Sequence, residues 1–443
     1  MLLIAVLLVG AAALAGRHAQ PAARPDHDDE IVANYGDQAG TMVLHWRGPD
    51  ATVFFGRDES YGGTATATAP VITPVDIAGP FREAKIDGLT AGTVYHYKIG
   101  DGADHTFKTS PTGDFTWVDI GDVSSTFKDP AAGSACDTPW VADHWRQIAQ
   151  EKPDFLTFGG DISYANKCGA GSVHQFFNDI KPVSTIAPME FAWGNHEYGG
   201  PTSPPAPKGT PRDRLDNYKG RLTMPNAQTL ANDTPSRLNH PGCPAVAPAT
   251  TNSCQGEDWG WFDASGIRFF LWPEGGEYQS TADAKAKSDP IMQAAQNDPK
   301  IRMIVIVAHR PVFSSISAEH PLRAELQDAV DTLHGKYPKL RLYLGHHLHG
   351  AEAMTPKNGV TYLTDGGGGV EEVRFPTKPG AFTSAGSVFH SSHPSHLLGT
   401  VSGNKMTLKF ICGPVYGRNP TKDACTQGDV MFTVNMDLPA ATG

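Results

Sequence analysis

The stretch Phe155-Leu156-Thr157-Phe158-Gly159-Gly160-Asp161-Ile162-Ser163-Tyr164 joins a short run without charges to polar side chains through glycine. Such a run, Phe155–Phe158, is typical of a parallel strand buried on both faces. Glycine just before Asp161 lets the backbone turn sharply and approach an ion closely. The stretch therefore predicts an α/β sheet with functional side chains just past the end of a strand.

The same pattern recurs after four further apolar runs, at 115–120, 189–193, 301–308 and 340–344. Because the carboxyl ends of the strands in an open α/β sheet border one crevice, polar side chains that are far apart in the sequence can meet there. Seven such side chains are enough for a site that holds two metal ions: Asp122, Asp161, Tyr164, Asn195, His309, His347 and His349.

Length and charge narrow the class of protein. A chain of 443 residues exceeds the usual size of one domain, so we expect two. The formal net charge of -11 and the lack of a basic stripe in the sequence argue against a nucleic-acid-binding protein, which must neutralise phosphates. Any recognition of phosphate is therefore expected to be local and to depend on metal.

Residues 1–29 are predicted to be a signal peptide and leader. The apolar stretch 2–15 is too short for a membrane-spanning helix but suits the core of a signal peptide, with small residues at 13–15 as a cleavage site. No basic residue precedes Arg17, so an uncleaved membrane anchor stays open as an alternative. Export predicts a secreted or extracytoplasmic protein, with no membrane contact beyond this segment.

The fold class predicted for the rest is mixed, a β-sandwich at residues 30–111 followed by an α/β catalytic domain at 112–443. Short alternating runs separated by turn residues indicate the sandwich. Apolar residues at helical spacing in 140–149 and 322–333, each before an apolar run, indicate βαβ units. The Pro-, Asn- and Gly-rich segment 200–255 is expected to be a surface excursion, and β-like runs at 405–411 and 430–434 end the chain.

Six cysteines fit an oxidising compartment and allow 15 disulfide connectivities, among which the sequence does not choose. Our working hypothesis pairs neighbours: Cys136 with Cys168, Cys243 with Cys254, and Cys412 with Cys425. A zinc cluster is the weaker alternative because no CxxC spacing occurs.

Two cations about 3.5–4 Å apart can activate water and clamp a phosphoryl group for in-line attack. Such a pair requires a bridging carboxylate, for which Asp161 is the candidate, with Asp122 on one ion and Asn195 on the other. Hard oxygen ligands suit a trivalent ion, while imidazoles suit a divalent one.

The ordered blocks resemble the purple acid phosphatase branch of the metallophosphoesterases. They are Gly121-Asp122, Gly160-Asp161-Ile162-Ser163-Tyr164, Gly194-Asn195-His196-Glu197, Val307-Ala308-His309-Arg310-Pro311 and His347-Leu348-His349-Gly350-Ala351-Glu352. The resemblance spans roughly residues 35–412 and implies a four-layer catalytic domain. It also includes the sandwich, because 89–97 resembles a fibronectin type III-like turn followed by a corner tyrosine.

The resemblance implies a ligand set for each cation. Fe³⁺ would be held by Asp122, Asp161, Tyr164 and His349, and a divalent Zn²⁺, Mn²⁺ or Fe²⁺ by Asp161, Asn195, His309 and His347. Two positions depart from the family pattern, because Ser124 and His346 stand where glycine is expected. Many other metallophosphoesterases carry histidine at the position of Ser124, and the resemblance implies that Tyr164 compensates for it here.

His196 and His320 are the candidates for protonating the leaving group, since an imidazole titrates in the useful range. Arg310 could face phosphate, but a surface salt bridge is an equal alternative. A lone aspartate at a strand end is more often a turn or helix cap than a metal ligand, and only the ordered set of seven favours metal. His390, His393 and His396 are expected to lie in a solvated loop.

The predicted function is a dinuclear-metal acid phosphatase that hydrolyses phosphate monoesters of small molecules by attack of metal-bound hydroxide. One alternative is a phosphodiesterase or nucleotide pyrophosphatase with the same metal pair. Another is a non-catalytic extracellular binding protein built on the sandwich. The sequence leaves the oligomeric state undetermined.

Overall fold

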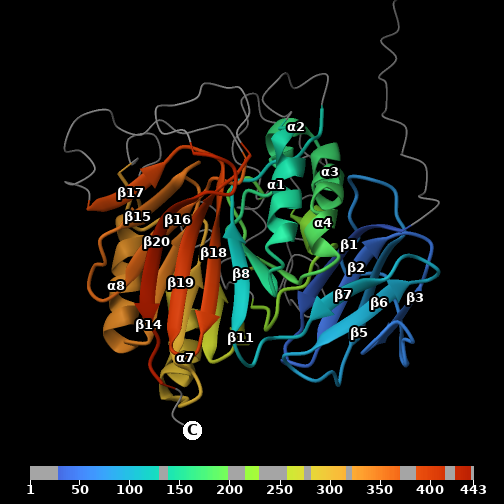
Figure 1. Ribbon diagram of the computed structural model, residues 1–443, viewed down its shortest axis with the longest axis horizontal. Helices are drawn as coiled ribbons and strands as arrows, with labels where there is room; N and C mark the ends of the chain where they lie inside the picture. Colours follow the sequence, from blue (N-terminus) through green and yellow to red (C-terminus); the bar gives the residue numbers. More distant parts are fainter. Residues whose placement is uncertain are drawn as a thin grey trace, which may run out of the picture.

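The computed structural model describes residues 28–128, 138–197, 215–228, 257–273, 281–315, 322–369, 386–414 and 425–440. Two antiparallel sheets form the N-terminal part, and two larger sheets with flanking helices form the remainder (Figure 1). The fold is thus mixed, as predicted. The predicted boundaries between the leader (1–29), the sandwich (30–111) and the catalytic domain (112–443) stay predictions. The first strand begins at Asp29, one residue before the predicted start of the sandwich.

The N-terminal sheets have the strand orders β1-β2-β5 and β4-β3-β6-β7. Their strands are β1 (Asp29–Tyr35), β2 (Met42–Arg47), β3 (Thr52–Gly56), β4 (Gly63–Thr66), β5 (Phe81–Ile86), β6 (Val94–Ile99) and β7 (His105–Lys108). In β6 every second side chain is buried, which is the period of a strand with one face on a core. The Tyr95 hydroxyl accepts a hydrogen bond from the Thr90 amide at 3.0 Å across the predicted turn. The fibronectin type III-like assignment stays a prediction.

The larger part contains two sheets that face each other. The first has the order β10-β9-β8-β18-β19-β20 and the second the order β11-β12-β13-β14-β16-β15-β17. The strands are β8 (Phe115–Ile120), β9 (Phe155–Phe158), β10 (Met189–Phe191), β11 (Gly260–Ala264), β12 (Ile267–Leu271), β13 (Met303–Val307), β14 (Leu340–Gly345), β15 (Ala351–Met354), β16 (Thr361–Asp365), β17 (Ser387–Ser391), β18 (Ser395–Ser402), β19 (Lys405–Cys412) and β20 (Val430–Asp437).

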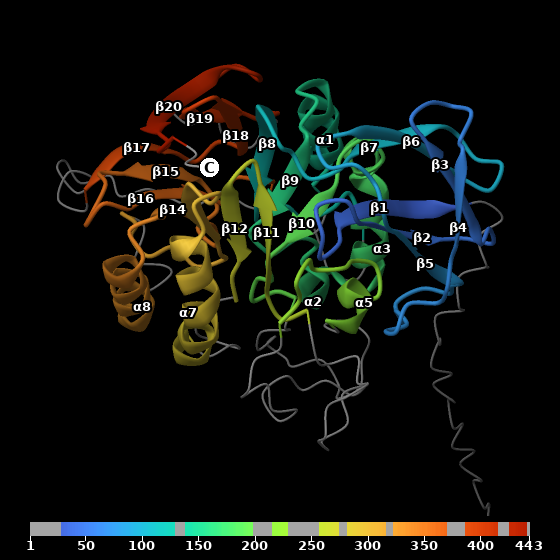
Figure 2. The ribbon, with the colours of Figure 1, turned by 90° about the horizontal axis from the view of Figure 1, so that it is seen from below.

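Helices cover the two outer faces, which gives four layers (Figure 2). The helices in the described ranges are α1 (Trp140–Gln150), α2 (Ala165–Cys168), α3 (Gly171–Asp179), α4 (Lys181–Ser184), α5 (Asp216–Lys219), α7 (Thr281–Asn297) and α8 (Ala324–Lys336). Trp145 of α1 and Phe176 of α3 pack on Phe158 of the first sheet. Between the sheets, Trp117 lies 5.7 Å from Phe269, centroid to centroid. The buried apolar runs therefore become strands with one face under helices and the other between sheets.

A buried ionic cluster joins the N-terminal part to the larger part. Arg221 Nε lies 2.6 Å from Glu30 Oε2 in β1, and Arg221 Nη1 lies 2.8 Å from Asp76 Oδ1. The guanidinium carbon is 4.7 Å from the ring centroid of Phe81 and 5.4 Å from that of Phe177. Because the three charged side chains are at most 1% exposed, their charges depend on one another.

Two sequence predictions are wrong. Residues 215–228, expected in a surface excursion, pack into the core, where Leu215, Tyr218 and Met224 are at most 3% exposed. The solvated loop expected at His390, His393 and His396 is instead the end of β17, a buried connection with His393 at 2% exposure, and the start of β18. There His396 is fully buried, and its ring nitrogens lie 2.9 Å from His144 Nε2 and 3.0 Å from Glu151. The segment that contains His390, His393 and His396 has no apolar periodicity, so local pattern could not reveal its burial.

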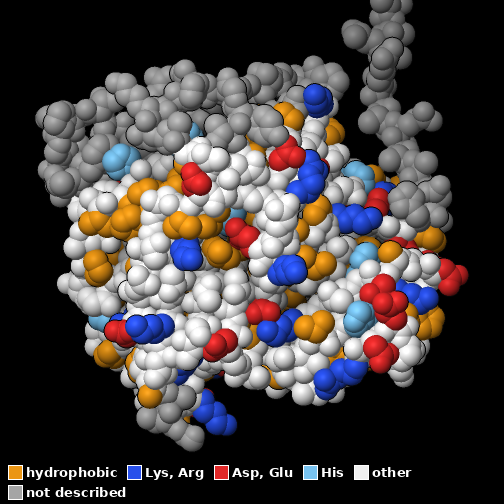
Figure 3. Space-filling view, viewed as in Figure 1, with side chains coloured by type: hydrophobic (Ala, Val, Ile, Leu, Met, Phe, Trp, Pro, Cys, Tyr) orange, Lys and Arg blue, Asp and Glu red, His pale blue; other side chains and the backbone are white. Residues whose placement is uncertain are grey.

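Other predictions are confirmed or stay open. The Cys412–Cys425 disulfide is present with a Cα–Cα distance of 6.1 Å, and Cys168 is also disulfide-bonded. Cys136, Cys243, Cys254 and the predicted leader up to residue 27 lie outside the described residues. No helix within the described ranges combines the length and apolar character needed to cross a bilayer. On the face in Figure 3, basic and acidic side chains are interspersed.

Candidate metal centre

The seven predicted ligands lie just past the carboxyl ends of strands in both large sheets. Asp122 follows β8, Asp161 and Tyr164 follow β9, and Asn195 follows β10, whereas His309 follows β13 and the pair His347 and His349 follows β14. Four of the seven have left-handed backbones, with φ of 56° at Asp122, 54° at Asp161, 53° at Tyr164 and 67° at His347. Non-glycine residues rarely adopt this conformation, and such strain concentrates at functional sites.

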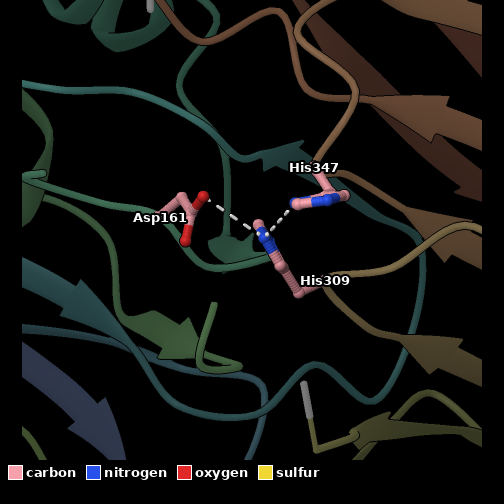
Figure 4. A group of neighbouring side chains, drawn as sticks. All are labelled: Asp161, His309 and His347. Atoms are coloured by element: carbon pink, nitrogen blue, oxygen red, sulfur yellow. Dashed lines mark hydrogen bonds and ion pairs between the residues drawn. The ribbon is translucent and has the colours of Figure 1, made fainter. Parts of the chain in front are cut away.

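One group of ligand atoms surrounds His309 (Figure 4). Its Nδ1 lies 2.8 Å from the Gly159 carbonyl oxygen and must donate to it, which leaves the lone pair on Nε2. That nitrogen lies 2.9 Å from Asn195 Oδ1, 3.3 Å from Asp161 Oδ2 and 3.0 Å from His347 Nδ1. Asp161 Oδ2 is buried and has no hydrogen-bond partner. The oxygens of Asn195 and Asp161 thus face the lone pair of His309 Nε2 as acceptors, the arrangement that a cation would stabilise.

A second group lies around Tyr164. Its hydroxyl is 3.1 Å from Asp122 Oδ1 and 3.0 Å from His349 Nε2, and these two atoms are 3.6 Å apart. Asp122 Oδ2 accepts a hydrogen bond from the His347 amide at 2.7 Å, which ties this group to the first. The donor set of carboxylate, phenol and imidazole is harder than the first set, which has two imidazoles. The residues therefore fit two different cations.

Burial disfavours the ionised forms of Asp122, Asp161 and Tyr164, so their ionisation depends on positive charge nearby. Burial, together with the charge of Asp161, raises the pKa of Asp122 to about 8 against the opposing effect of His309. For Asp161 burial acts in the same sense, but the neighbouring imidazoles of His309 and His196 hold its pKa well below its usual range. Burial and both aspartates raise the pKa of Tyr164 well above its usual value. Tyr164 can therefore be a phenolate only when a strongly charged cation lies beside it.

Glu197 has a role that the sequence did not reveal. It is fully buried, and its carboxylate accepts hydrogen bonds from the amides of Asp161 at 2.7 Å, Ile162 at 2.8 Å and Gly194 at 2.8 Å. Glu197 therefore joins the loop that carries Asp161 and Tyr164 to the loop that carries Asn195. The only signal in the sequence is its place two residues after Asn195.

Of the two candidate proton donors, the structure describes one. His196 packs on Tyr164 with ring centroids 4.3 Å apart, and its Nδ1 lies 2.6 Å from Asn166 Oδ1. Its Nε2 lies 3.9 Å from Asp161 Oδ2, so the ring borders the first group of ligands. Burial lowers the pKa of His196 to about 4, and the ring is neutral at neutral pH. His320 lies outside the described residues.

The structure also shows where Arg310, Ser124 and His346 lie relative to the predicted ligands. Arg310 is 6% exposed and its Nη1 lies 3.1 Å from His347 Nε2, which does not fit a surface salt bridge. A neutral imidazole carries one proton, so this contact must change when His347 Nδ1 binds a cation. Ser124 is 2% exposed, and His346 points between the two sheets rather than toward the ligands. The pair His347 and His349 is thus the one that reaches the site.

Comparisons with known proteins find relatives that are named purple acid phosphatases. No model of a known protein family matches the chain. Purple acid phosphatase 21 of Arabidopsis thaliana is 23% identical over 311 residues, which cover 67% of this chain and 60% of that protein. The Arabidopsis protein named probable inactive purple acid phosphatase 9 is 22% identical over 253 residues, or 53% of this chain and 36% of that protein. The chain thus spans less than two thirds of the length of these curated relatives.

A solved structure shares the fold. The purple acid phosphatase PPD1 from seeds of yellow lupin (Lupinus luteus) matches with a TM-score of 0.67 at 18% identity, covering 94% of this chain and 75% of that one. At this level of identity the likeness establishes the architecture alone. The chain is therefore purple acid phosphatase-like, related in sequence to proteins of that name and built on the metallophosphoesterase fold of the lupin protein.

Proposed function

We propose that this protein is a dinuclear metallophosphoesterase that hydrolyses phosphate monoesters of small molecules. The observation that carries the proposal is the convergence of Asn195 Oδ1, Asp161 Oδ2 and His347 Nδ1 within 3.3 Å of the lone pair on His309 Nε2. Asp122, Tyr164 and His349 form the adjoining group. Buried acceptors that face one another in this way are destabilising without a cation.

Each group of ligands suits one ion of the expected pair. We assign Fe³⁺ to Asp122, Tyr164 and His349, and Zn²⁺, Mn²⁺ or Fe²⁺ to Asn195, His309 and His347, with Asp161 shared. Bound there, the two cations would lower the pKa of water and neutralise charge on the phosphoryl oxygens. The protein keeps the ligands in place through Glu197 and excludes water around Asp122 and Asp161, which are at most 1% exposed.

His196 is assigned to the leaving group. Its ring borders the Asp161 carboxylate, and the Asn166 amide oxygen accepts the proton on Nδ1 at 2.6 Å, so Nε2 is left to exchange a proton or a hydrogen bond. Burial lowers the pKa of His196 to about 4, so the fraction of rings that can donate a proton rises as the solution becomes acidic. This direction is the one expected of an acid phosphatase. His320 stays a second candidate from sequence alone.

The test measures cation content together with turnover of a nitrophenyl monoester and a bis-nitrophenyl diester. Parent protein should hold two cations and prefer the monoester, and Asp161→Ala should lose both properties. Asp328→Ala is the matched control, because the Asp328 side chain is 79% exposed on α8. Faster turnover of the diester would replace the proposal with a phosphodiesterase. Two bound cations without turnover of either ester would indicate a non-catalytic binding protein.

The compartment is a separate proposal. The Cys412–Cys425 bridge and the disulfide at Cys168 support folding in an oxidising environment. Together with the apolar stretch 2–15, they favour an exported protein.

A further inference from the structure

His346 occupies the position where the family resemblance leads us to expect glycine, and its side chain lies behind the ligands. Side chains alternate along a strand, so residues 342 and 344 share one face of β14, and residue 346 follows directly after the end of the strand. Leu342 and Leu344 on that face belong to the core between the two sheets. His346 is fully buried and continues this inner face at the end nearest the ligands.

The imidazole of His346 bridges the two sheets. Its Nε2 lies 3.0 Å from Asp119 Oδ2 in β8 of the first sheet, and its Nδ1 lies 2.9 Å from the Ala308 carbonyl oxygen, next to His309. Both partners are acceptors, so both ring nitrogens donate and the ring pairs with Asp119 as a cation. Asp119 Oδ1 in turn accepts a hydrogen bond from Thr157 of β9 at 2.6 Å.

Glycines elsewhere make room for this ring. A Cβ on Gly159 would lie 1.7 Å from His346 Nδ1, and a Cβ on Gly121 would lie 2.6 Å from His346 Cδ2. Each glycine adjoins the metal centre, since Gly121 precedes Asp122 and the Gly159 carbonyl oxygen accepts the proton of His309 Nδ1 at 2.8 Å. The ring therefore contacts the backbone that places ligands from both sheets.

We propose that His346 is a positioning residue for the metal centre, and that its bridge to Asp119 sets the distance between the strand ends that carry His309 and His347 and those that carry Asp122 and Asp161. The inference rests on the proposed metal centre. Residues that orient metal ligands typically contribute about 10- to 100-fold to metal affinity. An effect of that size is expected here, largest for the cation held by His309 and His347.

The experiment measures the affinity for Zn²⁺ or Mn²⁺ by competition with a coloured chelator, and the stability of the same proteins by thermal unfolding. The variants are His346→Gln, whose single amide cannot reach both acceptors, and Asp119→Ala. Asp119→Asn keeps the shape of the side chain and removes its charge. It replaces His346→Gln or Asp119→Ala in the measurement if one of these two variants fails to fold. His45→Gln is the control, because His45 is 1% exposed in the N-terminal part, with Nε2 2.9 Å from Thr223 Oγ1.

We expect His346→Gln and Asp119→Ala to bind the cation at least about tenfold more weakly. The double variant should bind no more weakly than the worse single one, because both changes break the same bridge. His45→Gln should lose stability and keep its affinity. Folded variants at 346 and 119 that keep the parent's affinity within twofold, whatever their stability, would overturn the inference. Since the readout is binding, a parent that binds two cations but hydrolyses no ester would refute the proposed function alone.

Discussion

Tyr164→Phe removes a single oxygen atom from the centre of the second group of ligands. The hydroxyl lies 3.1 Å from Asp122 Oδ1 and 3.0 Å from His349 Nε2, while the ring packs on His196 with centroids 4.3 Å apart. Phenylalanine keeps the ring contact and removes both hydrogen bonds. The variant should therefore fold and should differ from the parent mainly at this site.

The size of the effect differs with and without cations. In the cation-free protein the raised pKa keeps the Tyr164 phenol protonated, so the loss is its two hydrogen bonds, to Asp122 and to His349, about 1–3 kcal/mol together. With cations bound, the group loses its anionic phenolate. Residues that merely support a ligand contribute about 10- to 100-fold to metal affinity, so removal of a ligand should reduce the affinity for Fe³⁺ by more than tenfold.

The assay combines a visible absorption spectrum, metal analysis and urea denaturation of parent and variant. The parent should be coloured under oxidising conditions through a phenolate-to-iron band, and the variant should be colourless with less iron. A variant that keeps its colour and its iron would refute the assignment of Tyr164. A colourless parent with two other cations would point to a different branch of the metallophosphoesterases.

Three further outcomes are expected. Arg221→Met should lower the free energy of unfolding by about 3–5 kcal/mol, because it leaves Glu30 and Asp76 buried without their guanidinium, and a loss below about 1 kcal/mol in urea denaturation would contradict this. Burial lowers the pKa of His45 to about 3 in the folded protein, so the unfolded chain takes up this proton first and stability falls as the pH drops from about 6.5 toward 3. His45→Gln should make that fall shallower by up to about 1.4 kcal/mol per pH unit, and equal slopes would count against burial as the cause. Chelation should lower the melting temperature, and a cation at about 100 times its Kd should restore about 2.7 kcal/mol per site, with no such response in Asp161→Ala.

The strand ends were predictable because their signals are local. A short apolar run, a glycine and then Asp122, Asp161 or His309 carry the pattern within a few residues, and the runs at 115–120 and 155–158 coincide with β8 and β9. The geometry also brings Asn195 and His347 to His309, as the ordered blocks predicted. The rule that the carboxyl ends of strands converge accounts for the ligands that follow strands of the same sheet.

Other features depend on pairings that no local pattern contains. β18 lies between β8 and β19, although almost 280 residues separate it from β8. The ligands come from two sheets rather than one, and the buried pairs His346–Asp119 and His144–His396 become visible only once those sheets face each other. Burial of Glu197 follows from the two loops it joins. Buried polar residues between the sheets show no periodicity in the sequence. Their burial depends on hydrogen-bond partners from other segments and not on their own spacing.

The division of the ligands between two sheets has a mechanical consequence. Asp122, Asp161 and Asn195 follow strands of one sheet, and His309, His347 and His349 follow strands of the other. Cations held between them would link the two sheets where their strand ends meet. Loss of the cations would then weaken the contact between the two sheets. The stability of the protein and its proposed turnover would therefore decline together.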